Sequence, residues 1–184
     1  MIGSLVGKLF GLLREAVPTV SRVAVLTNPA NPGSAPQLRA AEVAARAFDV
    51  QLQTLEARLP QEIDSAFAAM TRERAGALVI LVDGVFTNQV NQIAKLAAHR
   101  HLPSIYGLRE YADAGGLMVY SANVLDLERR AATYVDRIIK GTKAGDVPVE
   151  QPTNFDLVIN LKTAKALGLT IPPSLLLRAD QIIE

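Results

Sequence analysis

Hydrophobic and polar positions along the chain follow two periods, one typical of strands and one typical of helices. Residues 22–27 are apolar and β-branched, and residues 77–82 are a continuous apolar run, the pattern of a central parallel strand that is covered on both faces. Residues 50–55 alternate like a half-buried strand, and residues 103–106 begin a fourth strand. Between these strands, apolar residues recur at helical spacing: Leu38, Ala41, Ala45 and Phe48, then Ile63, Phe67 and Met70, then Val90, Ile93 and Ala97. This order predicts an α/β fold with a parallel sheet flanked by helices and joined by right-handed crossovers.

The pattern changes after residue 106. Residues 116–121 are typical of another strand, and apolar positions between 127 and 138 predict a long helix that ends at Gly141. A polar connection with two prolines follows, over residues 141–153. It leads to residues 155–160, which alternate like a strand.

The C-terminal segment carries its own start and stop signals. Asn160 is suited to cap a short helix, and Gly168 is suited to end it. Pro172 and Pro173 prevent this helix from continuing, and a last helix is predicted after them. At the other end of the chain, residues 1–18 are predicted to form an amphipathic helix. The residues that share its apolar face are Leu5, Leu9, Leu12 and Leu13.

The composition excludes several classes of function but does not identify one. The chain of 184 residues contains no cysteine, which excludes disulfides and thiolate-bound metals. Its formal net charge is +1 with no basic run and no tryptophan, so nucleic acid is not an expected partner. No apolar run approaches the ~20 residues that span a bilayer, and no export signal is recognisable.

Catalytic and cofactor motifs are also missing from the sequence. There is no G-x-G-x-x-G fingerprint and no G-x-S-x-G elbow, and no cofactor is expected. The histidines, His99 and His101, are two positions apart on a predicted helix and would not face one metal ion. These features predict a protein that is not an enzyme and has no metal site.

Polar residues that follow the predicted strands are the candidates for a binding site, because ligands of open parallel sheets bind beyond the carboxyl ends of the strands. Thr27 and Asn28 follow the first strand, although Asn28 also suits the turn that comes next. Asp83 follows the third strand and either pairs with a ligand amino group or caps the next helix. Phe86 and Tyr106 offer aromatic surface to a pocket, or equally belong to the core.

Three segments resemble one family. They are residues 12–32 (LLREAVPTVSRVAVLTNPANP), residues 101–141, which begin HLPSIYGLREYADAGG, and residues 151–184, which contain FDLVINLKTAKALGLTIPPSLLLRADQII. Each is similar to the corresponding part of bacterial ABC-transporter substrate-binding proteins of the type I periplasmic-binding-protein fold. The last segment matches the tail of that family almost residue for residue.

The resemblance implies a clamshell protein in which two α/β lobes close on a small solute, such as an amino acid, and deliver it to a permease. Some members bind aromatic amino acids. By similarity, the loops with Asn28, Asp83 and Tyr106 line the second-lobe wall of the cleft, and Tyr120 and Ser121 lie near the crossover between lobes. The resemblance implies a periplasmic location, whereas a chain without a signal peptide would be cytoplasmic if expressed as written.

Compared with the family, the chain resembles mainly the second lobe, and we expect either a truncated product or a fragment of a longer protein. Residues 19–111 and 148–184 would form the α/β ligand-binding lobe, and residues 112–147 would form a crossover strand and helix that belong to a missing first lobe. The helix face with Leu127, Ala131, Tyr134 and Ile138 would then be exposed. We expect a homodimer or swapped oligomer to cover this face together with the N-terminal helix.

Three functional hypotheses follow. The first is the solute-binding component of an ABC importer, with Thr27, Asn28, Asp83, Phe86, Tyr106, Tyr120 and Ser121 as ligand-binding residues. The second is a ligand sensor or oligomeric interaction module that has lost transport. The third, a small α/β enzyme, lacks a phosphate loop, paired acid and base groups and a nucleophile.

Overall fold

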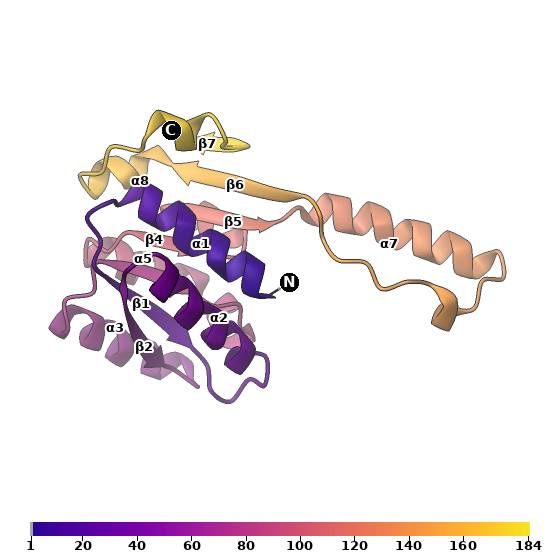
Figure 1. Ribbon diagram of the computed structural model, residues 1–184, viewed down its shortest axis with the longest axis horizontal. Helices are drawn as coiled ribbons and strands as arrows, with labels where there is room; N and C mark the ends of the chain where they lie inside the picture. Colours follow the sequence, from indigo (N-terminus) through magenta and orange to yellow (C-terminus); the bar gives the residue numbers. More distant parts are fainter. Residues whose placement is uncertain (1) are drawn as a thin grey trace.

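The apolar runs become the central strands of a sheet in the computed structural model, which describes residues 2–184 (Figure 1). The helices are α1 (Ile2–Ala16), α2 (Ser34–Ala47), α3 (Ile63–Arg72), α4 (Gly84–Thr87), α5 (Val90–His99), α6 (Glu110–Asp113), α7 (Val124–Ile139), α8 (Leu161–Ala166) and α9 (Pro173–Leu176). The strands are β1 (Arg22–Thr27), β2 (Gln51–Glu56), β3 (Ala77–Ile80), β4 (Ser104–Tyr106), β5 (Met118–Ala122), β6 (Phe155–Asn160) and β7 (Gln181–Ile183). Short 3-10 turns lie at Pro60–Glu62 and Ala144–Asp146.

Within the described residues, the strands form one seven-stranded sheet in the order β2-β1-β3-β4-β5-β6-β7. The first five of these are parallel, as the alternation of strands and helices predicts. Strand β6 then runs antiparallel to β5, with Tyr120 opposite Leu157, and β7 runs parallel to β6. The α/β class is therefore confirmed, and the sheet is mixed rather than wholly parallel.

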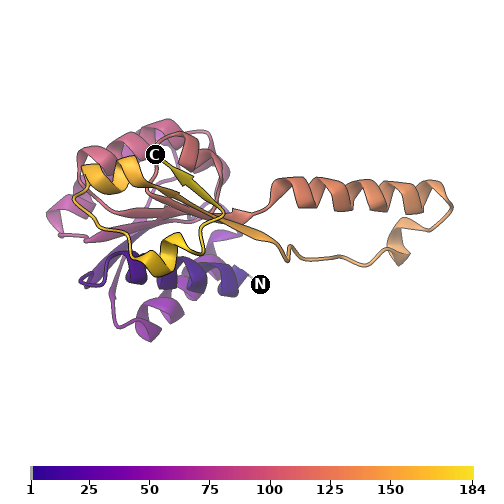
Figure 2. The ribbon, with the colours of Figure 1, turned by 90° about the horizontal axis from the view of Figure 1, so that it is seen from above.

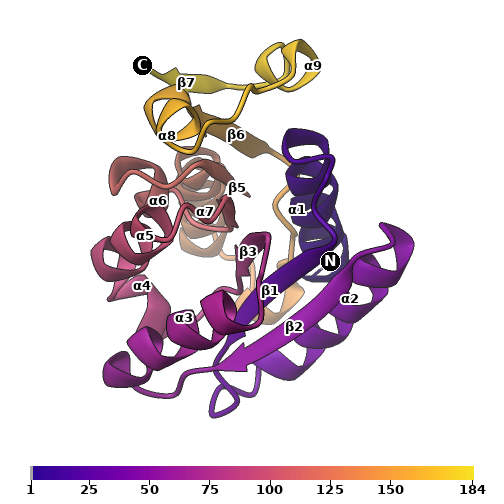
Figure 3. The same ribbon diagram turned by 90° about the vertical axis from the view of Figure 1, so that its left-hand side faces the viewer.

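Alternate residues of each central strand pack on opposite faces of the sheet. Val23 and Val25 of β1 belong to the core under α1 and α2, whereas Ala24 and Leu26 belong to the core under α3 and α5. Figure 3 shows the helices on both faces. Because both faces are covered, successive residues in the middle of β1 are all apolar.

Helix α1 is part of the lobe. Its apolar side chains Leu9, Leu12 and Leu13 are almost fully buried, and α1 packs against α2 and the sheet. The expectation that an oligomer covers the apolar face of this helix is therefore wrong, because the chain's own sheet covers it.

Helix α7 and the chain that returns from it form an arm that projects from the lobe (Figures 1 and 2). We call residues 124–154 the arm. No residue of α7 is buried. Arg130 fastens the returning chain to the helix, because its guanidinium lies 3.3 Å from Glu150 and donates a hydrogen bond of 2.6 Å to Thr153.

The C-terminal segment begins as predicted and ends differently. Asn160 caps α8 by accepting a 3.0 Å hydrogen bond from the backbone N–H of Thr163, and Gly168 has the positive φ of 69° that favours glycine. The predicted last helix is only the four-residue α9. Strand β7 follows it and extends the sheet beyond β6, which the sequence pattern did not reveal.

Candidate functional site

The carboxyl ends of the parallel strands meet at one edge of the sheet, where the loops after β1, β3 and β4 lie. The arm leaves the lobe from this same edge, directly after β5 (Figure 1). In open α/β sheets, this edge is where ligands bind. Polar side chains gather there from segments that are far apart in the sequence.

Asp83 is the centre of a buried polar cluster at this edge. Its carboxylate accepts hydrogen bonds from the side-chain amide of Asn28, at 3.1 and 3.2 Å, and from that of Asn31, at 2.8 Å. It also accepts a 2.8 Å bond from the backbone N–H of Val85 and so caps α4. Of the two roles open to Asp83 in the sequence, the structure shows the cap.

The two asparagines also shape the loop that follows β1. The side-chain oxygen of Asn28 accepts from the backbone N–H of Ala30, and that of Asn31 accepts from the N–H of Gly33. These local turns are typical of asparagine. Each asparagine thus uses its oxygen to fold its own loop and its nitrogen to bind the loop after β3.

Thr27 precedes this cluster at the end of β1. Its side chain is buried, and its hydroxyl oxygen has no hydrogen-bond partner within residues 2–184. A buried hydroxyl without a partner carries a desolvation cost, so this position is either strained or in need of a polar contact.

Phe86 and Tyr106 lie in the core rather than on an accessible wall, with exposed fractions of 1% and 0%. The ring of Tyr106 stacks on that of Tyr111, with centroids 4.1 Å apart, and the Tyr111 hydroxyl donates to the carbonyl of Phe86 at 3.0 Å. Burial raises the pKa of both tyrosines above the usual value of 10.0. In this structure neither Phe86 nor Tyr106 presents a ring to a solute.

Tyr120 and Ser121 point to opposite sides of β5, because side chains alternate along a strand. Tyr120 packs with the α1 side of the core and stacks on Phe155 at 5.3 Å. Ser121 is buried and lines a pocket of ≈ 230 Å³ where the arm joins the lobe. Tyr120 is thus separated from the other candidates, and Ser121 is among those at the sheet edge.

This arm-root pocket has both signs of charge. It is lined by Arg109, Ser121, Ala122, Asn123, Val124, Leu125 and Asp156. The carboxylate of Asp156 accepts from the side-chain amide of Asn123 at 3.1 and 2.9 Å, and the guanidinium of Arg109 contacts the side-chain oxygen of Gln181. A cation and an anion in one small pocket suit a zwitterion or a polar solute.

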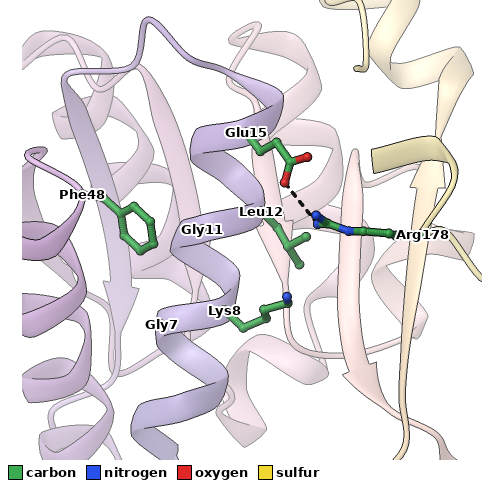
Figure 4. A pocket seen from close by; sticks show the side chains of 7 residues that line it. All are labelled: Gly7, Lys8, Gly11, Leu12, Glu15, Phe48 and Arg178. Carbon is green, nitrogen blue, oxygen red and sulfur yellow. Dashed lines mark ion pairs between the residues drawn. The ribbon is translucent and has the colours of Figure 1, made fainter. Parts of the chain in front are cut away.

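A second pocket, of ≈ 400 Å³, lies away from this edge, between α1, the end of α2 and the chain after α9. Figure 4 shows Lys8 and Arg178 approaching it from opposite sides, with Gly7 and Gly11 along α1. The guanidinium of Arg178 forms an ion pair of 3.1 Å with Glu15. This contact ties the C-terminal segment to α1.

The sequence did not single out several residues that build the edge. They are Asn31, Arg109, Asn123 and Asp156. The repeated Asn-Pro of residues 28–32 was a signal for Asn31. Asn123 meets Asp156 because β6 runs antiparallel to β5, which the pattern did not predict, and Arg109 lines the same pocket.

Within residues 2–184, no group of three or more His, Asp or Glu side chains is arranged to hold a metal ion. None of the helices in this part of the chain has the length and apolar content needed to cross a membrane.

The sheet order, the flanking helices and the crossing arm define a periplasmic-binding-protein type I-like fold, the class to which solved neighbours belong. A conserved domain protein from Vibrio cholerae superposes with a TM-score of 0.88 at 24% identity, over 96% of this chain and 60% of that one. The ABC domain from Streptococcus pneumoniae, solved with L-Trp, superposes with a TM-score of 0.87 at 24% identity, over 97% of this chain and 62% of that one.

The chain belongs to the ABC transporter substrate binding protein family, whose model matches residues 4–183. Members are solute-binding proteins and not enzymes. The chain is also 19% identical to a tyrosine-binding protein from Clostridioides difficile, over 89% of this chain and 47% of that protein. It therefore spans about half the length of this curated relative and about three fifths of these solved chains.

Proposed function

We propose that the protein is the solute-binding component of an ABC-type importer and that it binds a small solute such as an amino acid. The observation that carries this proposal is the family match over residues 4–183. The family is periplasmic or extracellular, and we propose the same location for this protein, with an ABC permease as its partner. Solute would lie between the strand-end edge of this lobe and a first lobe.

The arm-root pocket supports an amino-acid-like solute. The guanidinium of Arg109 suits a carboxylate, and the carboxylate of Asp156 suits an ammonium group. Ser121 adds a hydroxyl at the same place. The relatives solved with L-Trp or described as tyrosine-binding make an aromatic amino acid the first solute to test.

The remaining candidate residues take less direct roles in this proposal. Asn28 and Asp83 hold the two loops that form the edge, and Thr27 has a hydroxyl free for a contact there. Phe86 and Tyr106 are buried, and Tyr111 joins them by a hydrogen bond to the Phe86 carbonyl and a stacked contact with the Tyr106 ring, so we assign them a supporting role. Tyr120 lies on the other face of β5 and is the weakest of the proposed ligand-binding residues.

Calorimetric titration of the 184-residue chain with L-tyrosine and L-tryptophan tests the proposal. We expect saturable binding that is lost with tyramine, which is tyrosine without the carboxylate, and with 3-(4-hydroxyphenyl)propionate, which is tyrosine without the amine. Arg109→Gln should weaken binding by about tenfold or more, since a charged hydrogen bond is lost. Arg58→Gln, an exposed arginine after β2, is the matched control. No binding of any amino acid by the folded chain would contradict the proposal.

A second candidate function is a ligand-sensing or oligomeric interaction module derived from the same fold. The observation that favours it is the arm, whose helix has no buried residue. An exposed apolar helix face is typical of an interaction surface. We therefore propose a homo-oligomer as well. Solute binding by the chain would favour the first function, and self-association without solute binding would favour the second.

A further inference from the structure

The loop after β3 presents an apolar side chain at the strand-end edge. Val82 comes two residues after β3 and directly before Asp83, and it is 39% exposed. Among the described residues of the loops after β1, β3 and β4, it is the one large apolar side chain that is exposed. Its neighbour Leu81 is buried. Pockets for small solutes combine apolar wall residues with a few polar groups, and Val82 supplies apolar surface beside the polar cluster of Asp83.

The backbone of Val82 is held by the side-chain amide of Gln37, near the start of α2. The N–H of Val82 donates to the side-chain oxygen of Gln37 at 3.2 Å, and the side-chain nitrogen of Gln37 donates to the carbonyl of Val82, also at 3.2 Å. A side-chain amide carries both a donor and an acceptor, so Gln37 takes the place of a neighbouring strand where β3 has ended. Val82 therefore keeps a defined position without a solute.

The next residue in the sequence is fixed as well. The carboxylate of Asp83 accepts hydrogen bonds from the side chains of Asn28 and Asn31. Two consecutive positions of this loop are thus bound to the segment that runs from the end of β1 into α2. Binding to a surface that is ordered in advance costs less conformational entropy, so this loop is suited to hold a solute.

Val82 extends over the backbone of the neighbouring loop. A Cβ at Gly107, the first residue after β4, would lie 3.1 Å from the Cγ2 atom of Val82. Glycine at this position thus leaves room for the valine side chain. Arg109 is two residues further along the same loop and lines the arm-root pocket. The apolar surface of Val82 is therefore next to the loop that carries the cation of that pocket.

The sheet register places Val82 and the arm-root pocket at the same level of the edge. Ile80 pairs with Tyr106, and Tyr106 pairs with Val119. Val82 and Ser121 each lie two residues beyond this row. Neighbouring strands are about 4.8 Å apart, so β3 and β5 are separated by about 10 Å. A solute whose charged groups lie in the pocket reaches Val82 only if its side chain is long.

We propose that Val82 and Gly107 form the side-chain subsite of the solute site, and that the solute is an amino acid with a large apolar or aromatic side chain. Its carboxylate and ammonium group lie at Arg109 and Asp156, and its side chain crosses the end of β4 to contact Val82. Gln37 is a positioning residue, because it touches Val82 and not the solute. This inference rests on the proposed solute-binding function and deepens it.

Calorimetric titration of the 184-residue chain with L-alanine, L-leucine and L-tryptophan tests the side-chain subsite. We expect the affinity to rise along this series, because each larger side chain buries more apolar area. Val82→Ser should lower the affinity for L-tryptophan about tenfold and that for L-alanine by less than about twofold. Val43→Ser is the matched control, at a valine of α2 that is 58% exposed, and it should change neither affinity.

The role of Gln37 is tested by combining variants. Gln37→Met removes both hydrogen bonds to Val82 and should weaken L-tryptophan binding about fivefold, with little change for L-alanine. Added to Val82→Ser, it should have almost no further effect, because Gln37 acts through the side chain that is already missing. A purely structural role would give equal losses in both backgrounds and for both solutes. Circular dichroism of each variant checks that the fold is retained.

The outcomes separate the side-chain subsite from the proposed function. A folded chain that binds no amino acid would contradict the function and this subsite together. Amino-acid binding that Val82→Ser leaves unchanged, or lowers equally for L-alanine and L-tryptophan, would overturn the subsite and keep the function. Leu125 lines the arm-root pocket from the arm. Selective loss of L-tryptophan in Leu125→Ser, with none in Val82→Ser, would overturn the subsite and place the side chain against the arm.

Discussion

The side-chain amide of Asn28 donates hydrogen bonds to both carboxylate oxygens of Asp83, at 3.1 and 3.2 Å. Both residues are buried, and 55 positions separate them in the sequence. The contact joins the loop after β1 to the loop after β3. Any solute at the strand-end edge would therefore meet a surface whose shape depends on this pair.

Replacing either partner should destabilise the lobe. Asp83→Ala removes the α4 cap and leaves the amides of the buried Asn28 and the half-buried Asn31 without this acceptor, which should cost about 2–3 kcal/mol of unfolding free energy. Asn28→Ala should cost about 1–2 kcal/mol. Urea unfolding of both single variants and the double variant should give a coupling energy of about 1 kcal/mol, because the residues share a contact. Strictly additive losses would show that the pair is not coupled, and the exposed Asp113→Ala is the control.

Tyr106 should make the protein sensitive to alkaline pH. Burial raises the pKa of its hydroxyl in the folded state, and the side chain of Ser104 opposes only part of this shift. The folded state therefore holds its proton where the unfolded state, with a pKa of about 10, releases it. The resulting stability is complete below about pH 10 and is lost as pH rises above that value.

Tyr106→Phe isolates this effect. The hydroxyl of Tyr106 has no hydrogen-bond partner of normal geometry within residues 2–184, so the variant should be as stable as the parent at neutral pH. Thermal unfolding from pH 8 upward should show a shallower alkaline loss in the variant. Tyr111 also has a raised pKa, so part of the loss should remain. A neutral-pH loss above about 1 kcal/mol would mean that the hydroxyl has a partner after all.

The sequence pattern predicted the lobe well because its signals are local. Strand β1 was recognisable from one apolar run, and the caps at Asn160 and Gly168 from single residues with known backbone preferences. The candidates Thr27, Asn28 and Asp83 followed from one rule, that parallel strands end at the same edge. The structure brings the latter two into contact.

Features that depend on the pairing of distant segments could not be predicted in the same way. Asn123 meets Asp156 because β6 returns antiparallel to β5, and no local pattern specifies that direction. From the sequence, Tyr106 and Phe86 could line a pocket or belong to the core. The contacts of both residues with Tyr111 show that they belong to the core. The apolar face of α1 was likewise evident from the sequence, but the surface that covers it, the sheet of the same chain, was not.

The role of α1 as a core helix predicts a large effect at Leu13. This side chain is 0% exposed between α1 and the sheet. Leu13→Ala should lower the unfolding free energy by about 2–5 kcal/mol, because it removes buried methyl groups and leaves a cavity. Leu177→Ala, at a position that is 88% exposed, should change it by less than about 0.5 kcal/mol. Chemical unfolding followed by circular dichroism compares the two. Equal small effects would mean that α1 does not belong to the folded core.

Two glycines should respond to alanine in opposite directions. A Cβ at Gly116 would lie 2.7 Å from a ring carbon of Tyr106 and 2.7 Å from the backbone oxygen of Tyr111. Gly116→Ala should therefore cost about 1–3 kcal/mol, since the stacked tyrosines must move.

Gly7 should respond in the opposite direction. A Cβ at Gly7 would have no atom within 4 Å, and the residue lies inside α1. Gly7→Ala should stabilise the protein by about 0.5–1 kcal/mol, because alanine has a higher helix propensity than glycine. Paired urea titrations measure both values. Destabilisation by Gly7→Ala would show that the pocket beside α1 needs the bare backbone at that position.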